Sequence, residues 1–221
     1  LIFNMLKCVI LIPIGNSIDG QLIPQLLELQ TWCNQNNSKI LTIYGRPHNF
    51  ARNGLATGLK GFTNPSPPDA EWLIWIDSDI VFTIKQLEDL LSINEKHKFV
   101  SGWYQSNISD EVMCGNMDKD YFDKYQSMPF LSAKSLIEET NKNIGFAIKV
   151  DFVGFGFCKI HRSIIEKMEY PYFTLNLQEY SGYKDISAED VSFCQNCNNQ
   201  TGIRPIVVGR LKVGHLKNII I

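Results

Sequence analysis

Two aspartates that follow an apolar stretch are the residues best suited to chemistry. Residues 72–76 are apolar throughout, a pattern typical of a strand buried on both faces of a parallel sheet. Asp77 and Asp79 come next, and because alternate residues of an extended chain share a face, we expect both carboxylates on one side. Carboxylates at the carboxyl end of such a strand suit Mg²⁺ or Mn²⁺, and this ion suits a diphosphate.

The same short pattern occurs a second time, at Asp118 and Asp120. No apolar strand precedes this copy, which lies in a polar stretch. We interpret it as a solvated loop.

Composition indicates one globular domain spanning residues 1–221, since the chain is 44% hydrophobic and 20% charged. The net charge of −2 gives no reason to expect nucleic acid or an anionic membrane as a partner. An anionic substrate must therefore be held by local groups or by a metal.

The cysteines and the N-terminal region favour a cytoplasmic protein. The apolar run 9–14 is too short to span a bilayer, Pro13 interrupts it too early for a secretory signal, and we expect no transmembrane segment. The chain begins with Leu1, so Met5 is either the natural start or part of a longer protein. The six cysteines show no disulfide-framework spacing and are expected to be reduced, with the pair Cys194 and Cys197 structural.

The first half alternates strands and helices. Strands are expected at 7–13, 39–44, 72–76 and 99–104, with helical patterns between them. Asn49 is a candidate N-cap for a helix through Lys60, and Thr83 with Gln86 forms a capping box. This alternation predicts an α/β fold with a doubly wound, mainly parallel sheet.

The second half is less regular. Residues 105–145 are expected to form covering loops with a short helix at 133–139. A strand is expected at 150–160, where Gly154 and Gly156 mark bends or close approaches. We further expect a short helix at 162–168, a helix at 188–198 capped by Ser187, and strands at 203–208 and 211–213.

Several motifs in a fixed order resemble the GT-A glycosyltransferases, particularly family-2-like ones. Residues 50–58, which include Arg52 and Asn53, precede the apolar strand and its Asp-x-Asp. The stretch 150–160, the Pro-aromatic turn 170–173, the Glu-Asp helix from Ser187 and the C-terminal His215 follow in the family's order. The resemblance runs from residue 7 to 217, leaves 105–145 unmatched, and extends to compact glycosyltransferase domains of phages and large DNA viruses.

The resemblance implies a GT-A fold, with a Rossmann-like, mainly parallel central sheet flanked by helices and a smaller acceptor-side β region. Residues 7–104 would form the nucleotide-binding half and 105–217 the acceptor and catalytic half. The implied roles are metal binding for Asp79, Asp77 and His215; general base for Asp190 with Glu189 as alternate; nucleotide-sugar binding for Pro13, Ile14, Gly15, Arg52, Asn53, Asp77, Ser78 and Asp79; and the acceptor side for Asp151 and Gly154.

The implied activity is a Mn²⁺- or Mg²⁺-dependent transfer of a sugar from a nucleoside diphosphate to a carbohydrate or glycoprotein acceptor. A UDP-sugar is the default donor, with GDP- and dTDP-sugars as alternatives. The metal would neutralise the leaving diphosphate, and one carboxylate would take the proton of the acceptor hydroxyl with inversion.

Structural explanations compete with several of these roles. Asp190 stands three residues after Ser187 and could complete a capping box, and His215 could be an exposed turn residue. Asp151 could pair with a lysine. No functional role is expected for His48 or His161.

Two other functions remain open from the sequence. One is a haloacid-dehalogenase-like phosphohydrolase that uses Asp77 and Asp79, although that family places its motif on the first strand and adds a Gly-Asp-x-x-x-Asp that this chain lacks. The other is a catalytically inactive module that binds nucleotide-sugars.

Overall fold

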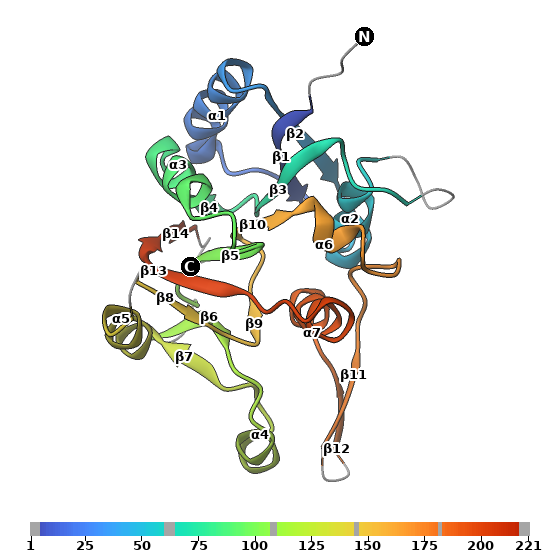
Figure 1. Cartoon of the computed structure of the whole chain (residues 1–221), viewed down its shortest axis with the longest axis vertical. Helices are drawn as coiled ribbons and strands as arrows, with labels where there is room; N and C mark the ends of the chain where they lie inside the picture. Colours follow the sequence, from blue (N-terminus) through green and yellow to red (C-terminus); the bar gives the residue numbers. More distant parts are fainter. Residues whose placement is uncertain (1–4, 60–64, 107–109, 144–145, 181–182, 217–221) are drawn as a thin grey trace.

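A seven-stranded sheet forms the centre of the molecule (Figure 1). The structure is a computed structural model and describes residues 5–59, 65–106, 110–143, 146–180 and 183–216. The strand order is β2-β1-β3-β10-β5-β13-β8. The strands are β1 (Leu6–Ile14), β2 (Ser38–Tyr44), β3 (Ala70–Ile76), β5 (Phe99–Trp103), β8 (Ala147–Lys149), β10 (Phe157–His161) and β13 (Ile206–Lys212).

Five of these strands point the same way. β2, β1 and β3 are mutually parallel, β5 and β13 share their direction, and β10 and β8 run opposite. This arrangement confirms the expected α/β class with a mainly parallel sheet.

The strand period places one hydrophobic core on each face of the sheet. Val9 and Leu11 of β1 point to one face, whereas Cys8, Ile10 and Ile12 point to the other. Because both faces are covered, β1 and β3 are apolar over almost their whole length.

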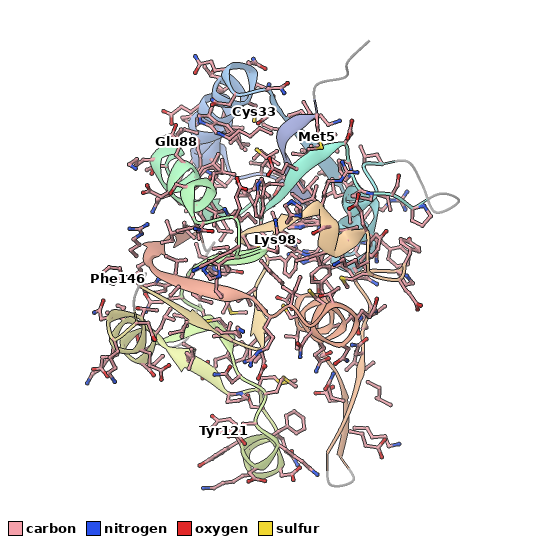
Figure 2. The ribbon with its side chains drawn as sticks, in the orientation of Figure 1. Met5, Cys33, Glu88, Lys98, Tyr121 and Phe146 are labelled. Atoms are coloured by element: carbon pink, nitrogen blue, oxygen red, sulfur yellow. The ribbon has the colours of Figure 1, made fainter. Side chains whose placement is uncertain are left out.

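Helices divide between the two faces. The helices α1 (Ile23–Gln35), preceded by the 3₁₀ turn η1 (Gly20–Leu22), and α3 (Ile84–Ser92) pack on one core, and Figure 2 labels Cys33 on α1 and Glu88 on α3. The indole N–H of Trp32 in α1 donates to Glu88. The helices α2 (His48–Ala56), α6 (Arg162–Ile165) and α7 (Glu189–Thr201) pack on the other. The expected capping box of Thr83 and Gln86 is confirmed at the start of α3.

Three small sheets lie around the central one, and the second half of the chain supplies all of their strands except β4. Their pairings are β7-β6-β9, β11-β12 and β14-β4. The elements are β4 (Ile80–Val81), β6 (Glu111–Gly115), α4 (Lys119–Tyr125), β7 (Phe130–Ser132), α5 (Ala133–Asn141), β9 (Phe152–Val153), β11 (Leu177–Tyr180), β12 (Tyr183–Ile186) and β14 (Gly214–His215). The expectation of covering loops over 105–145 was wrong for β6, α4 and β7, whereas the helix expected at 133–139 is confirmed.

The continuous strand expected at 150–160 was also wrong. It is divided into β9 and β10, which belong to different sheets. Gly154 and Gly156 lie at the division, where the Tyr104 ring packs so closely that a Cβ at either glycine would collide with it. The apolar composition indicated burial correctly but did not show the break.

Smaller differences concern element ends. α2 begins at His48 after Pro47, so Asn49 is not its N-cap, and the expected end at Lys60 lies outside the described residues. The two strands expected after residue 203 are one strand, β13. In the described part of the chain, no helix has the length and apolar character needed to cross a bilayer.

Candidate functional site

The chain turns sharply at the carboxyl end of β3. The strand ends at Ile76, and the backbone N–H of Ile80 donates to the carbonyl of Asp77 (3.1 Å). The turn gives the two carboxylates different partners, because Asp77 bonds to Arg52 of α2 whereas Asp79 pairs with His215 of β14. Both residues nevertheless line one cavity.

Arg52 connects three elements beneath this turn. It lies on α2 with only 2% of its surface exposed. Its Nη2 donates to both carboxylate oxygens of Asp77 (2.9 and 3.1 Å) and its Nε to Glu189 at the start of α7 (3.1 Å). The guanidinium also lies over the rings of Trp75 and Phe155. A buried cation held in this way fixes the directions of both carboxylates.

Asp79 is paired with the C-terminal histidine. His215 Nε2 lies 3.0 Å from a carboxylate oxygen of Asp79. The antiparallel pair β4-β14 brings the two residues together, and the N–H of Leu216 donates to the carbonyl of Asp79 (2.7 Å). The Asp79 side chain is about half exposed, at 52%. The structure therefore unites two residues that lie 136 positions apart.

A cavity of about 240 Å³ opens at this end of β1 and β3. Its lining consists of Pro13, Gly15, Ser17, Asp19, His48, Asp77, Ser78, Asp79 and Leu216. Five residues expected to contact a nucleotide-sugar are therefore gathered there, namely Pro13, Gly15, Asp77, Ser78 and Asp79. Its place at the carboxyl ends of parallel strands is typical of ligand sites in open α/β sheets.

His48 is a member of this site that the sequence reasoning set aside. Its Nδ1 lies 3.6 Å from Glu189, and this contact raises the pKa of His48. The available signal was its spacing, because His48 and Arg52 are four residues apart on one helix and so share a face. Ser17, Asp19 and Leu216 carried no comparable signal.

The two acids at the start of α7 have opposite environments. Burial alone would raise the pKa of Glu189, but His48 and Arg52 outweigh it and lower that pKa to about 2. Burial and the neighbouring Glu189 raise the pKa of Asp190 to about 6, although Arg52 opposes this change. Asp190 accepts a hydrogen bond only from the next backbone N–H, of Val191 (2.7 Å), among the contacts described.

Ser187 does not cap this helix. The N-cap is Ala188, and the Ser187 hydroxyl instead contacts Ser192 (2.7 Å) and donates to the carbonyl of Asn176 (3.2 Å). The expected Ser187 cap was therefore wrong. Without this cap, Asp190 cannot be explained as the second residue of a capping box.

Three other residues expected at the site, Asn53, Ile14 and Gly154, pack within the protein or form hydrogen bonds inside it. The Asn53 amide donates to the carbonyls of Asn49 and Phe173 and accepts from the Phe173 N–H, so it fixes the turn after Pro171. Ile14 packs against the core rather than lining the cavity. Gly154 is closely packed under Tyr104.

Asp151 is paired, but with an arginine rather than a lysine. Its carboxylate contacts Arg204 (2.8 Å) and accepts from the N–H of Met117 (2.8 Å). It lines a second, larger pocket.

All six cysteines are buried free thiols, in agreement with the expected reduced state.

The residues expected to bind a metal are only partly assembled. No group of three or more His, Cys, Asp or Glu side chains in the described ranges is close enough to hold an ion. Asp79 and His215 meet, whereas Asp77 is committed to Arg52. One carboxylate and one imidazole fit a divalent ion whose remaining ligands are substrate oxygens or water.

The fold has relatives among solved structures. No protein-family model and no curated protein sequence matches the chain. The structure of A197 from STIV aligns with a TM-score of 0.58 and 20% identity over 96% of this chain and 87% of that one. GalNAc-T7, solved with UDP, GalNAc and Mn²⁺, aligns with a TM-score of 0.53 and 13% identity over 97% of this chain. The alignment covers 44% of GalNAc-T7, so this chain spans less than half of that protein. These likenesses show a shared fold.

Proposed function

We propose that this protein is a metal-dependent glycosyltransferase of GT-A type. It would move a sugar from a nucleoside diphosphate, with UDP as the first candidate, to a carbohydrate or glycoprotein acceptor. The observation that carries the proposal is the cavity at the ends of β1 and β3, with Asp77, Asp79 and the Asp79–His215 pair at its edge. The fold shared with a protein solved with UDP, GalNAc and Mn²⁺ supports it.

The donor would lie in this cavity. Pro13, Gly15 and Ser78 would contact the nucleotide, and Asp79 with His215 would hold Mn²⁺ or Mg²⁺ together with diphosphate oxygens. The bound ion would neutralise the negative charge that develops on the leaving diphosphate. Arg52 faces away from solvent, so its role in this proposal is to position Asp77 and Glu189.

Asp190 is the better of the two candidate bases. A pKa of about 6 leaves its carboxylate deprotonated at neutral pH while keeping it basic enough to accept a proton. Glu189, with its pKa lowered to about 2 and its oxygen engaged by Arg52, is a weaker base. We propose that Asp190 takes the proton of the acceptor hydroxyl, with inversion at the transferred carbon.

Calorimetric titration tests the donor site. UDP, GDP and dTDP are titrated with and without Mn²⁺ into the wild type, Asp79→Ala and Asp120→Ala. Asp120 is the matched control because it is the last residue of the second Asp-x-Asp and is exposed on α4. We expect one nucleotide to require both Mn²⁺ and Asp79, with Asp120→Ala unchanged. Absence of binding under every condition would refute the proposal.

Donor hydrolysis then separates an enzyme from an inactive binding module. An active transferase is expected to release the nucleoside diphosphate slowly in the absence of acceptor and to lose this release in Asp79→Ala. Nucleotide binding without any release would favour the inactive module.

A further inference from the structure

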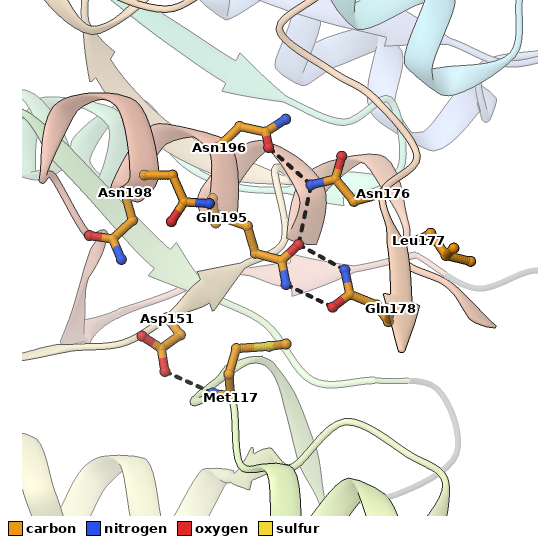
Figure 3. Close-up of a pocket in the computed structure, with 10 residues that line it drawn as sticks. Met117, Asp151, Asn176, Leu177, Gln178, Gln195, Asn196 and Asn198 are labelled. Carbon is orange, nitrogen blue, oxygen red and sulfur yellow. Dashed lines mark hydrogen bonds between the residues drawn. The ribbon is translucent and has the colours of Figure 1, made fainter. Parts of the chain in front are cut away.

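A second pocket, of about 650 Å³, lies along α7 and away from the Asp77 turn. α7 and β11 form one side of it, and Met117 with Asp151 form another (Figure 3). Six of its ten lining residues are amides, namely Asn176, Gln178, Gln195, Asn196, Asn198 and Asn199. The remaining members are Met117, Asp151, Leu177 and Cys194.

Four of the amides bond to one another and make the wall rigid. Gln178 and Gln195 form a reciprocal pair, with N···O distances of 2.9 and 3.1 Å. The Asn176 amide donates to Asn196 (3.0 Å) and to Gln195 (3.3 Å). These bonds hold β11 against α7, so the amide orientations are set before any ligand arrives.

The pocket also offers amides that the protein does not use. The side chains of Asn198 and Asn199 have no hydrogen-bond partner among the described residues, and both are exposed. Figure 3 shows Asn198 above Asp151 at one end of the pocket, with Gln178 at the other. Arg204 and the Met117 N–H fix the Asp151 carboxylate there. Donors and acceptors therefore face the same space.

This chemistry matches hydroxyl groups. A hydroxyl both donates and accepts, as an amide does, and a carboxylate accepts from it. No lysine, arginine or histidine lines the pocket, and Asp151 carries its only formal charge among the lining residues. Because Arg204 pairs with this carboxylate, the pocket is close to neutral, and its lining contains no cation to bind an anionic ligand such as a phosphate or an acidic sugar. The volume lies in the range of ordinary ligand sites.

The position of the pocket relates it to the proposed base. Asn198 comes eight residues after Asp190 on the same helix, which is about 12 Å along the helix axis at 1.5 Å per residue. An oligosaccharide can reach across this distance, whereas a single sugar cannot.

We propose that this amide-lined pocket binds the neutral sugar residues of an acceptor glycan, beyond the sugar that receives the transfer. The acceptor role rests on the proposed glycosyltransferase function. The pocket selects uncharged, polyhydroxylated chains, and Asn198 and Asn199 supply the hydrogen bonds that recognise them.

Saturation-transfer NMR with defined oligosaccharides provides the test. The probes are maltotriose, chitotriose, mannotriose and a neutral lactose-based tetrasaccharide, each compared with a sialylated or carboxylated counterpart. We expect at least one neutral probe to bind and its acidic counterpart to bind more weakly. Replacing both Asn198 and Asn199 by alanine should weaken that binding about tenfold, because two hydrogen bonds are lost.

The matched control is the double substitution Asn34→Ala and Gln35→Ala. This exposed amide pair lies at the end of α1, as Asn198 and Asn199 lie near the end of α7. The control should bind the probe as the wild type does. The proposal is overturned if no neutral probe binds, if acidic probes bind better, or if the control loses as much affinity as the pocket variant.

Asp79→Ala distinguishes failure of this inference from failure of the proposed function. It should keep glycan binding and lose nucleotide binding. Glycan binding by a wild type that binds no nucleotide would leave a carbohydrate site but overturn its acceptor role. Nucleotide binding without glycan binding would overturn the pocket assignment alone.

Discussion

Replacing Arg52 by methionine tests whether this buried cation holds the site together. Methionine keeps an unbranched apolar side chain at this position but removes the guanidinium that lies over the rings of Trp75 and Phe155, and its charge with it. The carboxylates of Asp77 and Glu189 would then lose the cation that pairs with both of them. Leaving a partly buried charge unpaired is strongly destabilising, typically by about 3–5 kcal/mol.

The expected magnitude follows from Glu189. Its pKa falls from 4.5 to about 2 in the folded protein, which corresponds to about 3 kcal/mol of stability. Because the folded-state pKa is depressed, this stability is fully present above pH 4.5 and is lost as the pH falls toward 2. His48 contributes part of this shift, so the share of Arg52 at Glu189 is smaller than the whole, and the loss of the partner of Asp77 adds to it. We therefore expect Arg52→Met to lower the free energy of unfolding at pH 7 by about 2–3 kcal/mol.

Urea unfolding followed by tryptophan fluorescence measures this loss. Repeating it from pH 7 to pH 3 should show a shallower loss of stability on acidification for Arg52→Met than for the wild type. Arg162→Met is the control, because Arg162 pairs with the exposed side chains of Glu166 and Asp69 and should cost at most about 1 kcal/mol. Equal losses for the two variants, or parallel pH curves for Arg52→Met and wild type, would refute the reasoning.

Two further predictions concern the base and the core. Transfer activity should rise with pH through about 6, because the raised pKa of Asp190 keeps its carboxyl protonated and unable to accept a proton at lower pH. An initial-rate pH profile checks this. Asp190→Asn should abolish the activity while retaining nucleotide binding. Gly156→Ala should destabilise the protein by about 1–3 kcal/mol, since the added Cβ would lie 2.6 Å from the Tyr104 ring. Thermal unfolding measures this loss, with Gly20→Ala, where no atom lies within 4 Å of the added Cβ, as a control that should unfold nearly as the wild type does.

The first half of the fold was readable because its signals are local. Runs such as 72–76 are apolar on both faces, and the capping box of Thr83 and Gln86 is a short-range pattern. The second half depends on pairings between distant segments. β6 pairs with both β7 and β9, and β10 lies in the central sheet between β3 and β5. Neither arrangement has a short-range sequence signature.

For the candidate site, the sequence supplied the candidate residues. Asp77 and Asp79 stood out by their types and spacing, and the resemblance to GT-A glycosyltransferases implied roles for Asp190 and His215. Only the tertiary structure decided their partners. After the turn that follows Ile76, Asp77 bonds to Arg52, whereas Asp79 pairs with His215. The physical reason is that a carboxylate is directed by the charge that folding brings beside it, and these charges come from helices and strands far away in the sequence.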